Sequence, residues 1–443
     1  MERKTIILGA GITGLAAGFS SGFPIYERSQ LPGGLCGSYY LRPGDPRRLR
    51  SPPADGEVYR FEFGGGHWLW GGDQLVHHFL KEFTPLKTYD RRASAYFADQ
   101  NLLVPYPVQH HLKYFGAQVA LRAAGEIARC RGEHGQTVTM ADWFENHFGH
   151  TLNEMFFSPY HLRYTAGLSS SVAPQDASKS PLDLAHVRAG AHGTHQESAG
   201  YNAQFSYPIG GLDAVVGPLA RVCQIHYGKE AVKILTKDRS IRFTDGSTLL
   251  WNNLISTLPL DRTMRLAGLS VDEEADPFTS VLVTNIGAKR GRGCPNEHWV
   301  YIVRSSCAFH RVGFYSNVDA SFLPVSAQRT GRLVSLYVET AYPGGGKPKP
   351  AEVSALTAAI IAELRKWAWI EDTQIVDATW VETAYTWRRP ASGWAERSLQ
   401  VLNERGIHQV GRYGRWASTV GQQSIFNSIG EGLLAGAAFS VAR

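Results

Sequence analysis

The chain has 443 residues, of which 43% are hydrophobic and 19% charged, and its formal net charge is +6 at pH 7. This length and balance exclude a fibrous or disordered protein and predict two or three packed domains. Apart from the run PRRLR at 46–50, the basic residues are spread along the chain. The charge therefore favours an arginine-lined phosphate site, and we expect no nucleic-acid partner.

Cysteine usage and hydropathy bound the location of the protein. No run approaches the ~20 apolar residues of a membrane span, and the glycines of the apolar N-terminal stretch favour a nucleotide fold over a signal peptide. The cysteines are odd in number and lack the spacing of a metal site, which predicts free buried thiols, no metal and a reducing compartment. We therefore expect a cytoplasmic protein with no membrane partner. The cysteines are Cys36, Cys130, Cys223, Cys294 and Cys307.

The first motif is GAGITG, which follows a β-branched and aliphatic run at 5–8 and precedes the helical stretch LAAGF. Gly9, Gly11 and Gly14 thus lie between a strand and a helix, as a dinucleotide-binding fingerprint requires. These glycines permit a tight turn, let the backbone approach a pyrophosphate, and let the helix pack closely on the strand. A glycine-rich turn that binds nothing would not need the elements that come next.

Glu27 ends the next predicted strand, about 13 residues past the last glycine of the fingerprint. A carboxylate there can accept hydrogen bonds from both hydroxyls of a ribose. Gly33, Gly34 and Ser38 extend the pattern. The combination is typical of two-dinucleotide-domain flavoproteins that bind FAD, rather than of simple NAD dehydrogenases.

Three glycines stand directly before a histidine in RFEFGGGHWLW at 60–70. Glycine weakens a strand, so this stretch predicts backbone pressed against something flat and large. We expect Gly65 and Gly66 to lie against the flavin ring. Contact with the flavin ring does not explain the third glycine, Gly64. Our interpretation is that Gly64 gives the loop freedom to follow the redox state of the flavin.

The middle of the chain alternates between helical and strand patterns. Helical spacing at 109–129 and 139–157, the second with a Thr139/Asp142 capping box, predicts a helical insertion. A turn and helix at 208–225 and a β-meander at 232–258 follow. From about 272 to 390 strands dominate, with one helix near 351–369, which predicts an antiparallel substrate sheet.

The end of the chain, HQVGRYGRWASTVGQQSIFNSIGEGLL, predicts a short strand, a Gly-Arg-x-Gly turn and a long helix of small residues. The N-terminal N–H groups of such a helix can face the flavin pyrimidine carbonyls and stabilise negative charge on the reduced ring. Both ends of the chain would then belong to one domain. Further cofactor contacts are expected from Val232, Gln423 and Ser424.

The sequence thus predicts an α/β fold: a Rossmann-like FAD flavoprotein with a helical insertion and an antiparallel substrate sheet. The domain bounds that we expect are 1–90, 208–270 and 400–443 for the FAD-binding domain, 108–200 for the helical domain, and 91–107 with 271–399 for the sheet domain.

The order of the motifs resembles that of the UDP-galactopyranose mutase family, most of all its eukaryotic-type branch. The similarity spans nearly the whole chain and rests on GAGITG, GGGHW, VPYPVQHH, SPYHLRY, YNAQFSYPIGG, HWVY, HRVGFYSN and GRYGRWASTVGQQS. The resemblance implies reduced FAD, with NADPH or NADH as reductant, whose N5 attacks the anomeric carbon of a UDP-sugar and expels UDP. The flavin–sugar adduct opens and recloses through another hydroxyl, which interconverts pyranose and furanose with no net redox.

The resemblance also assigns roles to residues of the substrate site. Tyr106 and Gln109 match a pair that holds uracil, through an aromatic face and an amide. Arg311 and Arg412 match two arginines that clamp the diphosphate, a leaving group whose growing charge a guanidinium stabilises.

Further family positions fall on Tyr301 and Tyr385, which match diphosphate-contacting tyrosines. Asn202 matches an asparagine near flavin and sugar, Arg188 an arginine near the ligand, and His67 the histidine packed at the flavin N5 edge. The sequence alone is equally consistent with surface or packing roles for Arg188 and Tyr385 and with a packing role for His67, and it does not argue that His67 acts as a base.

Three departures from the family pattern concern the nucleoside and sugar walls. Ser418 replaces a tyrosine of the diphosphate clamp, His161 an asparagine that helps hold the uridine, and Thr165 a tryptophan. The first turn is also extended by a loop rich in proline and arginine at 42–56. A related nucleotide sugar is therefore as credible a substrate as UDP-galactose.

Three functions remain open from the sequence. The leading hypothesis is an isomerase, a flavin-dependent nucleotide-sugar mutase, which the paired arginines and PYPVQ favour. The alternative is an FAD-dependent oxidoreductase of the amine oxidase or protoporphyrinogen oxidase type, with a hydrophobic or aromatic-caged substrate site. The third is a flavin-binding protein that has lost catalysis. The sequence also leaves open whether the chain forms a homo-oligomer.

Overall fold

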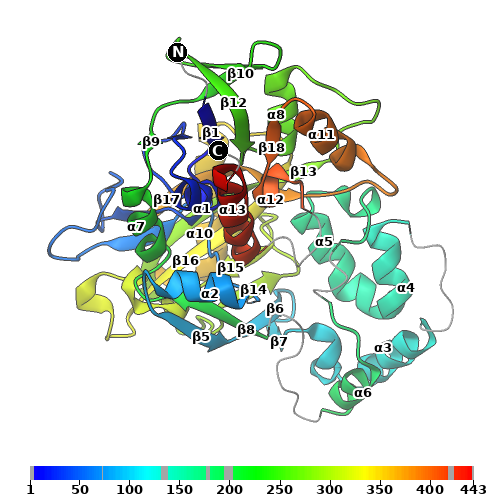
Figure 1. Cartoon of the computed structure of the whole chain (residues 1–443). Helices are drawn as coiled ribbons and strands as arrows, with labels where there is room; N and C mark the ends of the chain where they lie inside the picture. The colour runs from blue at the N-terminus through cyan, green and yellow to red at the C-terminus, as the bar shows by residue number, and fades with distance from the viewer. Residues whose placement is uncertain are drawn as a thin grey trace.

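The computed structural model of the chain describes residues 4–71, 73–130, 138–175, 180–193, 203–417 and 424–441. Two large sheets lie beside a lobe of helices (Figure 1). The predicted α/β class is confirmed, because parallel strands, antiparallel strands and helices all contribute. None of the described helices is long and apolar enough to cross a membrane.

The first sheet is built around β1 (Lys4–Leu8), the strand that leads into GAGITG. β1 pairs in parallel with its neighbours on both sides, and its apolar residues are buried, as expected for a strand covered on both faces. The predicted β-meander forms the antiparallel end of this sheet. The other strands are β2 (Ile25–Tyr26), β9 (Ile225–His226), β10 (Ala231–Leu235), β11 (Ser240–Phe243), β12 (Thr248–Ser256) and β18 (Ile407–Gln409).

The helix after GAGITG, α1 (Ile12–Ser21), packs along the last helix, α13 (Ile425–Val441). The two backbones lie so close that a Cβ added at Gly432 or Gly436 would collide with the α1 backbone. The first and last helices of the chain therefore lie side by side (Figure 1). The other helices near this sheet are α7 (Asp213–Val222), α8 (Leu260–Ala267), α11 (Trp394–Asn403) and α12 (Gly411–Gly414).

The second sheet carries most of the strands predicted between 272 and 390, in the order β17-β13-β16-β15-β14-β6-β7. Its pairs are antiparallel except β14 with β6, so the prediction of a purely antiparallel sheet is wrong at that pair. A long stretch of chain separates β6 from β14, so no hairpin dictates their direction. The strands are β6 (Ala93–Phe97), β7 (Leu102–Pro105), β13 (Phe278–Arg290), β14 (Trp299–Ile302), β15 (Arg311–Gly313), β16 (Leu333–Pro343) and β17 (Ile370–Thr386).

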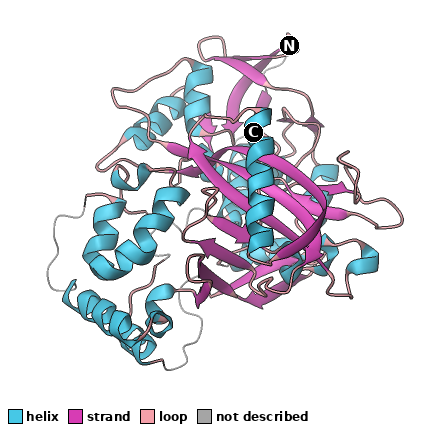
Figure 2. Cartoon of the chain, turned by 180° about the vertical axis from the view of Figure 1, so that it is seen from behind, coloured by secondary structure: helices cyan, strands magenta, loops and turns pink. Residues whose placement is uncertain are grey.

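One face of the second sheet is covered by α10 (Pro350–Lys366), close to the predicted helix at 351–369 (Figure 2). Ile360 and Leu364 of this helix pack with aliphatic residues of β13, β14 and β16 in one buried cluster. The opposite face of the sheet is therefore the one left to contribute side chains to a cavity.

The helical lobe is formed by α3 (Ala117–Cys130), α4 (Met140–Leu152), α5 (Ser158–Tyr164) and α6 (Leu184–His192), with a π-helix at Asn153–Phe157. The capping box of Thr139 and Asp142 is confirmed at the start of α4. The helix predicted from 109 is wrong before 117, where two short 3₁₀ turns end at Gly116 with φ 86°.

Shorter elements join these parts. The helices α2 and α9 lie outside the two large sheets, and two further sheets of two antiparallel strands each pair β3 with β4 and β5 with β8. Their bounds are β3 (Ser38–Leu41), β4 (Tyr59–Glu62), α2 (Gln74–Lys81), β5 (Leu86–Asp90), β8 (Gln204–Pro208) and α9 (Tyr315–Val318).

All five cysteines are free thiols as predicted, but only Cys36 is buried, so the prediction of burial is wrong for the other four.

A buried polar cluster joins β4 to β8. Glu62 is 0% exposed and accepts a hydrogen bond from the Tyr207 hydroxyl. Burial raises the pKa of Glu62 to about 8, and the Tyr207 hydrogen bond and the charge of Arg60 offset this only in part. The folded protein therefore keeps this carboxyl protonated at pH values where the unfolded chain releases the proton.

Replacing Glu62 by glutamine tests this buried proton. The folded pKa lies above the unfolded one, so the wild type loses stability as pH rises from about 4.5 to about 8. Glu62→Gln removes that loss, and its free energy of unfolding, measured by denaturant titration, should exceed that of the wild type by roughly 2–5 kcal/mol at pH 9 but not at pH 4.5. The exposed Glu371→Gln is the control. A difference that does not change with pH would contradict the account.

Candidate functional site

A cavity of about 400 Å³ lies at the carboxyl end of β1. In parallel α/β sheets this edge is where ligands bind. Five of the predicted cofactor residues line the cavity: Gly9, Gly11, Glu27, Gly33 and Gly34. No side chain caps the start of α1, so its first N–H groups face the cavity ready to bind an anion.

Hydrogen bonds fix Glu27 in the wall of this first cavity. Its two carboxylate oxygens accept hydrogen bonds from the backbone N–H groups of Ala10 and Ser29, each at 2.7 Å. Each oxygen has further acceptor capacity, which suits a pair of ribose hydroxyls. Sequence reasoning missed Lys229 and Arg262, which line the cavity as well and come from segments distant from the glycine motif.

Two glycines of the turn, Gly14 and Gly11, differ in what a side chain at their position would meet. A Cβ at Gly14 would collide with the backbone oxygen of Gly9, so Gly14 is required by the fold itself. No described atom lies within 4 Å of a Cβ built on Gly11. Because Gly11 also lines the cavity, its open side is space that a ligand can fill.

A second cavity, of about 220 Å³, adjoins the first. Both are lined by Leu35, His67, Val381, Arg412, Tyr413 and Ile425. Ile425 is the first residue of α13, and Ser424, directly before it, lines the second cavity. The N-termini of α1 and α13 therefore both open on the combined cavity.

The loop at 64–67 is shaped by protein side chains rather than only by open space. A Cβ at Gly66 would collide with the hydroxyl of Tyr337 and the ring of Trp68, and a Cβ at Gly64 would collide with the imidazole of His67. Gly65 has φ 81°, a left-handed conformation, and lines neither cavity. The structure thus supplies the missing reason for Gly64, while our redox interpretation of that glycine stays a prediction.

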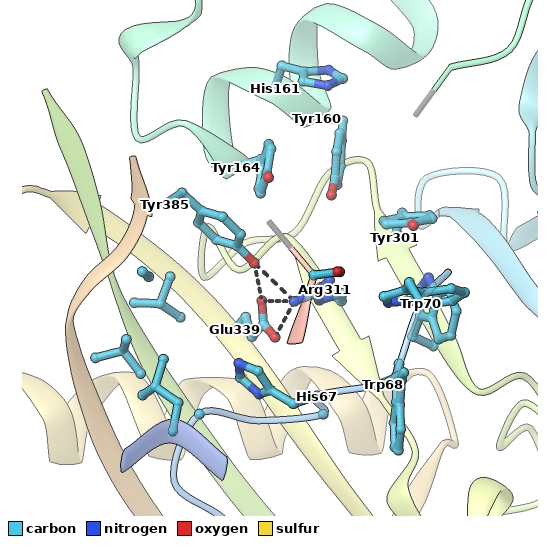
Figure 3. A pocket seen from close by; sticks show the side chains of 18 of the residues that line it. His67, Trp68, Trp70, Tyr160, His161, Tyr164, Tyr301, Arg311, Glu339 and Tyr385 are labelled. Carbon is cyan, nitrogen blue, oxygen red and sulfur yellow. Dashed lines mark hydrogen bonds and ion pairs between the residues drawn. The ribbon is translucent and has the colours of Figure 1, made fainter. Parts of the chain in front are cut away.

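His67 stands at the junction of the two cavities, beneath Glu339 in the close view (Figure 3). Its Nδ1 lies 3.1 Å from the backbone oxygen of Gly65. Burial lowers the pKa of His67 against the opposing effect of that hydrogen bond, and the nearby positive charge of Arg412 lowers it further. The imidazole is therefore neutral at physiological pH.

Arg311 lies in the second cavity within a network that the sequence did not reveal. Its Nη2 donates to both carboxylate oxygens of Glu339, at 2.5 and 2.6 Å, and to the Tyr385 hydroxyl at 3.0 Å (Figure 3). Arg412 approaches from α12, donates to the backbone oxygen of Ala384 at 3.2 Å, and lies over the ring of Tyr385. The two predicted arginines are thus brought to one cavity.

Aromatic side chains make up most of the remaining wall. Tyr160, His161 and Tyr164 come from α5 (Figure 3). Tyr106 and Tyr301 meet with ring centroids 4.8 Å apart. Nδ1 of His161 lies 2.8 Å from the backbone oxygen of Phe157, which fixes its ring. The other aromatic lining residues are Trp68, Trp70, Phe156, Phe157, Trp299, Tyr385 and Tyr413.

Several predicted site residues lie elsewhere. Gln109 is 1% exposed, donates to the backbone oxygen of Pro181 at 2.6 Å, and lines neither cavity. Arg188 lies exposed on α6, Ser38 is buried beside Asp213, and the side chain of Val232 is exposed on β10.

Three of the predicted residues, Asn202, Ser418 and Gln423, lie outside the described residues. Thr165, one of the departures from the family pattern, is buried and donates to the backbone oxygen of His161 at 2.7 Å, so it does not form the cavity wall.

The residues of the first cavity fit the FAD that the resemblance implies. The cavity is lined by an acidic side chain, by an uncapped helix start with an open Gly11, and by residues that it shares with the second cavity. Among the described residues, no group of three or more His, Cys, Asp or Glu is placed to hold a metal ion.

Comparison with known proteins supports the fold. No family model and no curated protein matches the chain. A crystal structure of reduced UDP-galactopyranose mutase matches with a TM-score of 0.83 and 21% identity, over 100% of this chain and 95% of that one. An oxidoreductase from Methanosarcina mazei has a TM-score of 0.58 and 16% identity, over 99% of this chain and 100% of that one. A structure of putrescine oxidase bound to putrescine matches with a TM-score of 0.57 and 14% identity, over 100% of both chains. The predicted flavoprotein fold is confirmed.

Alanine substitutions in the glycine turn test the cofactor cavity. Gly11→Ala should fold with the wild-type melting temperature but retain less than about a tenth of the FAD, because its methyl group fills space left for the ligand. Gly14→Ala should instead lower the melting temperature of the apoprotein, because its methyl group collides with the Gly9 backbone. Flavin absorbance relative to protein absorbance measures the first effect. Full FAD content in Gly11→Ala would remove this turn from the cofactor site.

Proposed function

We propose that the chain is an FAD-dependent mutase that interconverts the pyranose and furanose forms of a nucleotide sugar, with no net redox. The substrate would be UDP-galactose or a related nucleoside-diphosphate hexose. One observation carries the proposal: His67 and Arg412 line both cavities. The ring end of a bound flavin and the diphosphate of a sugar nucleotide would therefore meet at that junction.

The residues of the first cavity would hold FAD. Glu27 would accept hydrogen bonds from the ribose, and the start of α1 would face the pyrophosphate. When bound and reduced, the flavin supplies an electron-rich nitrogen that can displace a leaving group at an anomeric carbon. The N-terminus of α13 at Ile425 would favour negative charge on the reduced ring.

The residues of the second cavity would hold the leaving group. Arg311 and Arg412 offer fixed positive charge to a diphosphate whose charge grows as its bond to the sugar breaks. Tyr301 and Tyr385 line the same space with hydroxyl groups. Keeping the diphosphate between these groups lets it recombine with the sugar after the ring has changed size.

The aromatic walls and His67 would protect the reacting sugar. Closely packed rings such as Tyr160 and Tyr301, with centroids 5.4 Å apart, leave little room for water, which would otherwise hydrolyse an activated anomeric carbon. The neutral imidazole of His67 adds no further charge beside the flavin edge.

The base of the nucleotide is the least defined part of the substrate. Gln109, which the resemblance assigns to uracil, uses its amide nitrogen on Pro181 and lies outside the cavity. Tyr106 retains its place on the wall. This supports testing several bases rather than uracil alone.

The second candidate is an FAD-dependent oxidoreductase of the amine oxidase type, which the aromatic walls favour. Against it stand Arg311 and Arg412, since a protonated amine would be repelled by guanidinium groups in the same cavity. Steady oxygen consumption with amines, together with no binding of UDP, would establish that alternative.

A substrate panel tests the proposal directly. The purified protein should show the FAD spectrum. Dithionite serves as the chemical reductant, and NADPH and NADH are the reductants that we propose for the cytoplasm. The reduced protein should interconvert the pyranose and furanose forms of at least one of a panel of UDP-, TDP-, CDP- and GDP-hexoses. Chromatography that separates pyranose from furanose products gives the readout. Turnover by the oxidised protein alone would refute a mutase that works through reduced flavin.

Arg311→Lys tests the diphosphate clamp while keeping the charge that balances Glu339. Lysine cannot reproduce the planar fork, so kcat/KM should fall roughly 10²–10³-fold. Arg415→Lys is the matched control, because Arg415 pairs with Glu431 and lines neither cavity. Near-normal kcat/KM in Arg311→Lys would remove Arg311 from the clamp.

A further inference from the structure

Glu339 lies on β16 of the second sheet and lines the second cavity. In the strand register Tyr301 of β14 is opposite Arg311 of β15, which in turn is opposite Glu339 of β16. Their side chains therefore lie in a row on three adjacent strands, and all three line the cavity. Register alone places the carboxylate beside the guanidinium.

The carboxylate of Glu339 is held on every side. It is 2% exposed, accepts from Arg311, and lies 3.4 Å from both the Tyr385 hydroxyl and the Nε2 of His310. Its Oε1 lies at 3.3 Å from the position of a Cβ on Gly65, so the loop before His67 rests against it. Glu339 thus connects the arginine of the proposed clamp with the loop at the flavin edge.

Glu339 acts as a fixed charge. Burial opposes its ionisation, but the charge of Arg311 and the proximity of His310 outweigh burial and lower the pKa of Glu339 to about 2. The Glu339 carboxyl is therefore ionised at physiological pH and has no proton to donate there.

This fixed charge changes how the cavity holds an anion. Among the described lining residues, the permanently charged side chains are Arg311, Arg412 and Glu339. The carboxylate occupies the Nη2 edge of Arg311, cancels one of two positive charges, and repels any diphosphate that binds nearby.

We propose that Glu339 is the positioning residue that aims Arg311 into the cavity and sets how tightly the cavity holds a diphosphate. The inference rests on the proposed function. A diphosphate that must leave and then return should not be bound so tightly that its departed state becomes a trap. Glu339 prevents that trap while it holds Arg311 in place for the leaving group.

Binding of inorganic pyrophosphate to the FAD-loaded protein, measured by calorimetry, tests this role. Glu339→Gln keeps an oxygen for Arg311 but removes the charge, so it should bind pyrophosphate about tenfold more tightly than the wild type, with a smaller gain for phosphate. Glu339→Asp keeps the charge and should stay within about twofold of the wild type. Glu363→Gln, a buried glutamate on α10 outside this cavity, is the control.

The outcomes separate this role from a structural one. Tighter pyrophosphate binding by Glu339→Gln, with a lower KM and a lower kcat in turnover, supports the proposal. Unchanged or weaker pyrophosphate binding by Glu339→Gln, or no measurable binding by either protein, would overturn it. If Glu339→Gln does not fold, tighter binding by Glu339→Asp than by the wild type overturns it instead. UDP is titrated in parallel: if pyrophosphate binds as expected but UDP binds no better than pyrophosphate, the nucleotide-sugar function fails and the role of Glu339 stands.

Discussion

The packing of α1 against α13 is the contact on which the site depends. Glycines on α13 let the two helices approach until a single added methyl group would collide. This approach brings the N-terminus of the first helix and the N-terminus of the last helix to one combined cavity. Two helix starts then present N–H groups to the same elongated space, although more than 400 residues separate them in sequence. A ligand with a pyrophosphate in its middle and an electron-accepting ring at its end suits such a space.

Two buried glutamates illustrate how neighbours decide the charge of a site. Glu62 is buried with a tyrosine hydroxyl on one oxygen, and its pKa rises to about 8. Glu339 is equally buried, but a guanidinium donates to both of its oxygens and its pKa falls to about 2. The first residue therefore behaves as a neutral hydrogen-bonding group within the fold. The second is an anion inside a cavity that we propose for an anionic substrate, so its charge opposes the binding of that substrate.

Local signals allowed the sequence to predict much of this structure. The glycine turn, the capping box of Thr139 and most strands depend on neighbours within a few residues, and they lie where the patterns indicated. The parallel pairing of β6 with β14 and the row from Tyr301 to Glu339 depend on strands that meet only in the folded chain. No pattern within β16 distinguishes Glu339 from a surface glutamate. Gly65 and Gly66 likewise lie against Tyr337, which is distant in sequence.

The residues carried over from the resemblance divide in the same way. Those on the second sheet and on the loop at 64–67, such as Arg311 and His67, line the combined cavity, whereas Gln109 and Arg188 do not. The junction between the two cavities, which His67 and Arg412 line, is therefore the central feature of the proposed site. A crystal structure of the reduced, FAD-loaded protein with UDP tests that claim most directly. The account predicts the diphosphate between Arg311 and Arg412 and the flavin ring edge beside His67. UDP bound away from both arginines, or a flavin ring outside the junction, would contradict it.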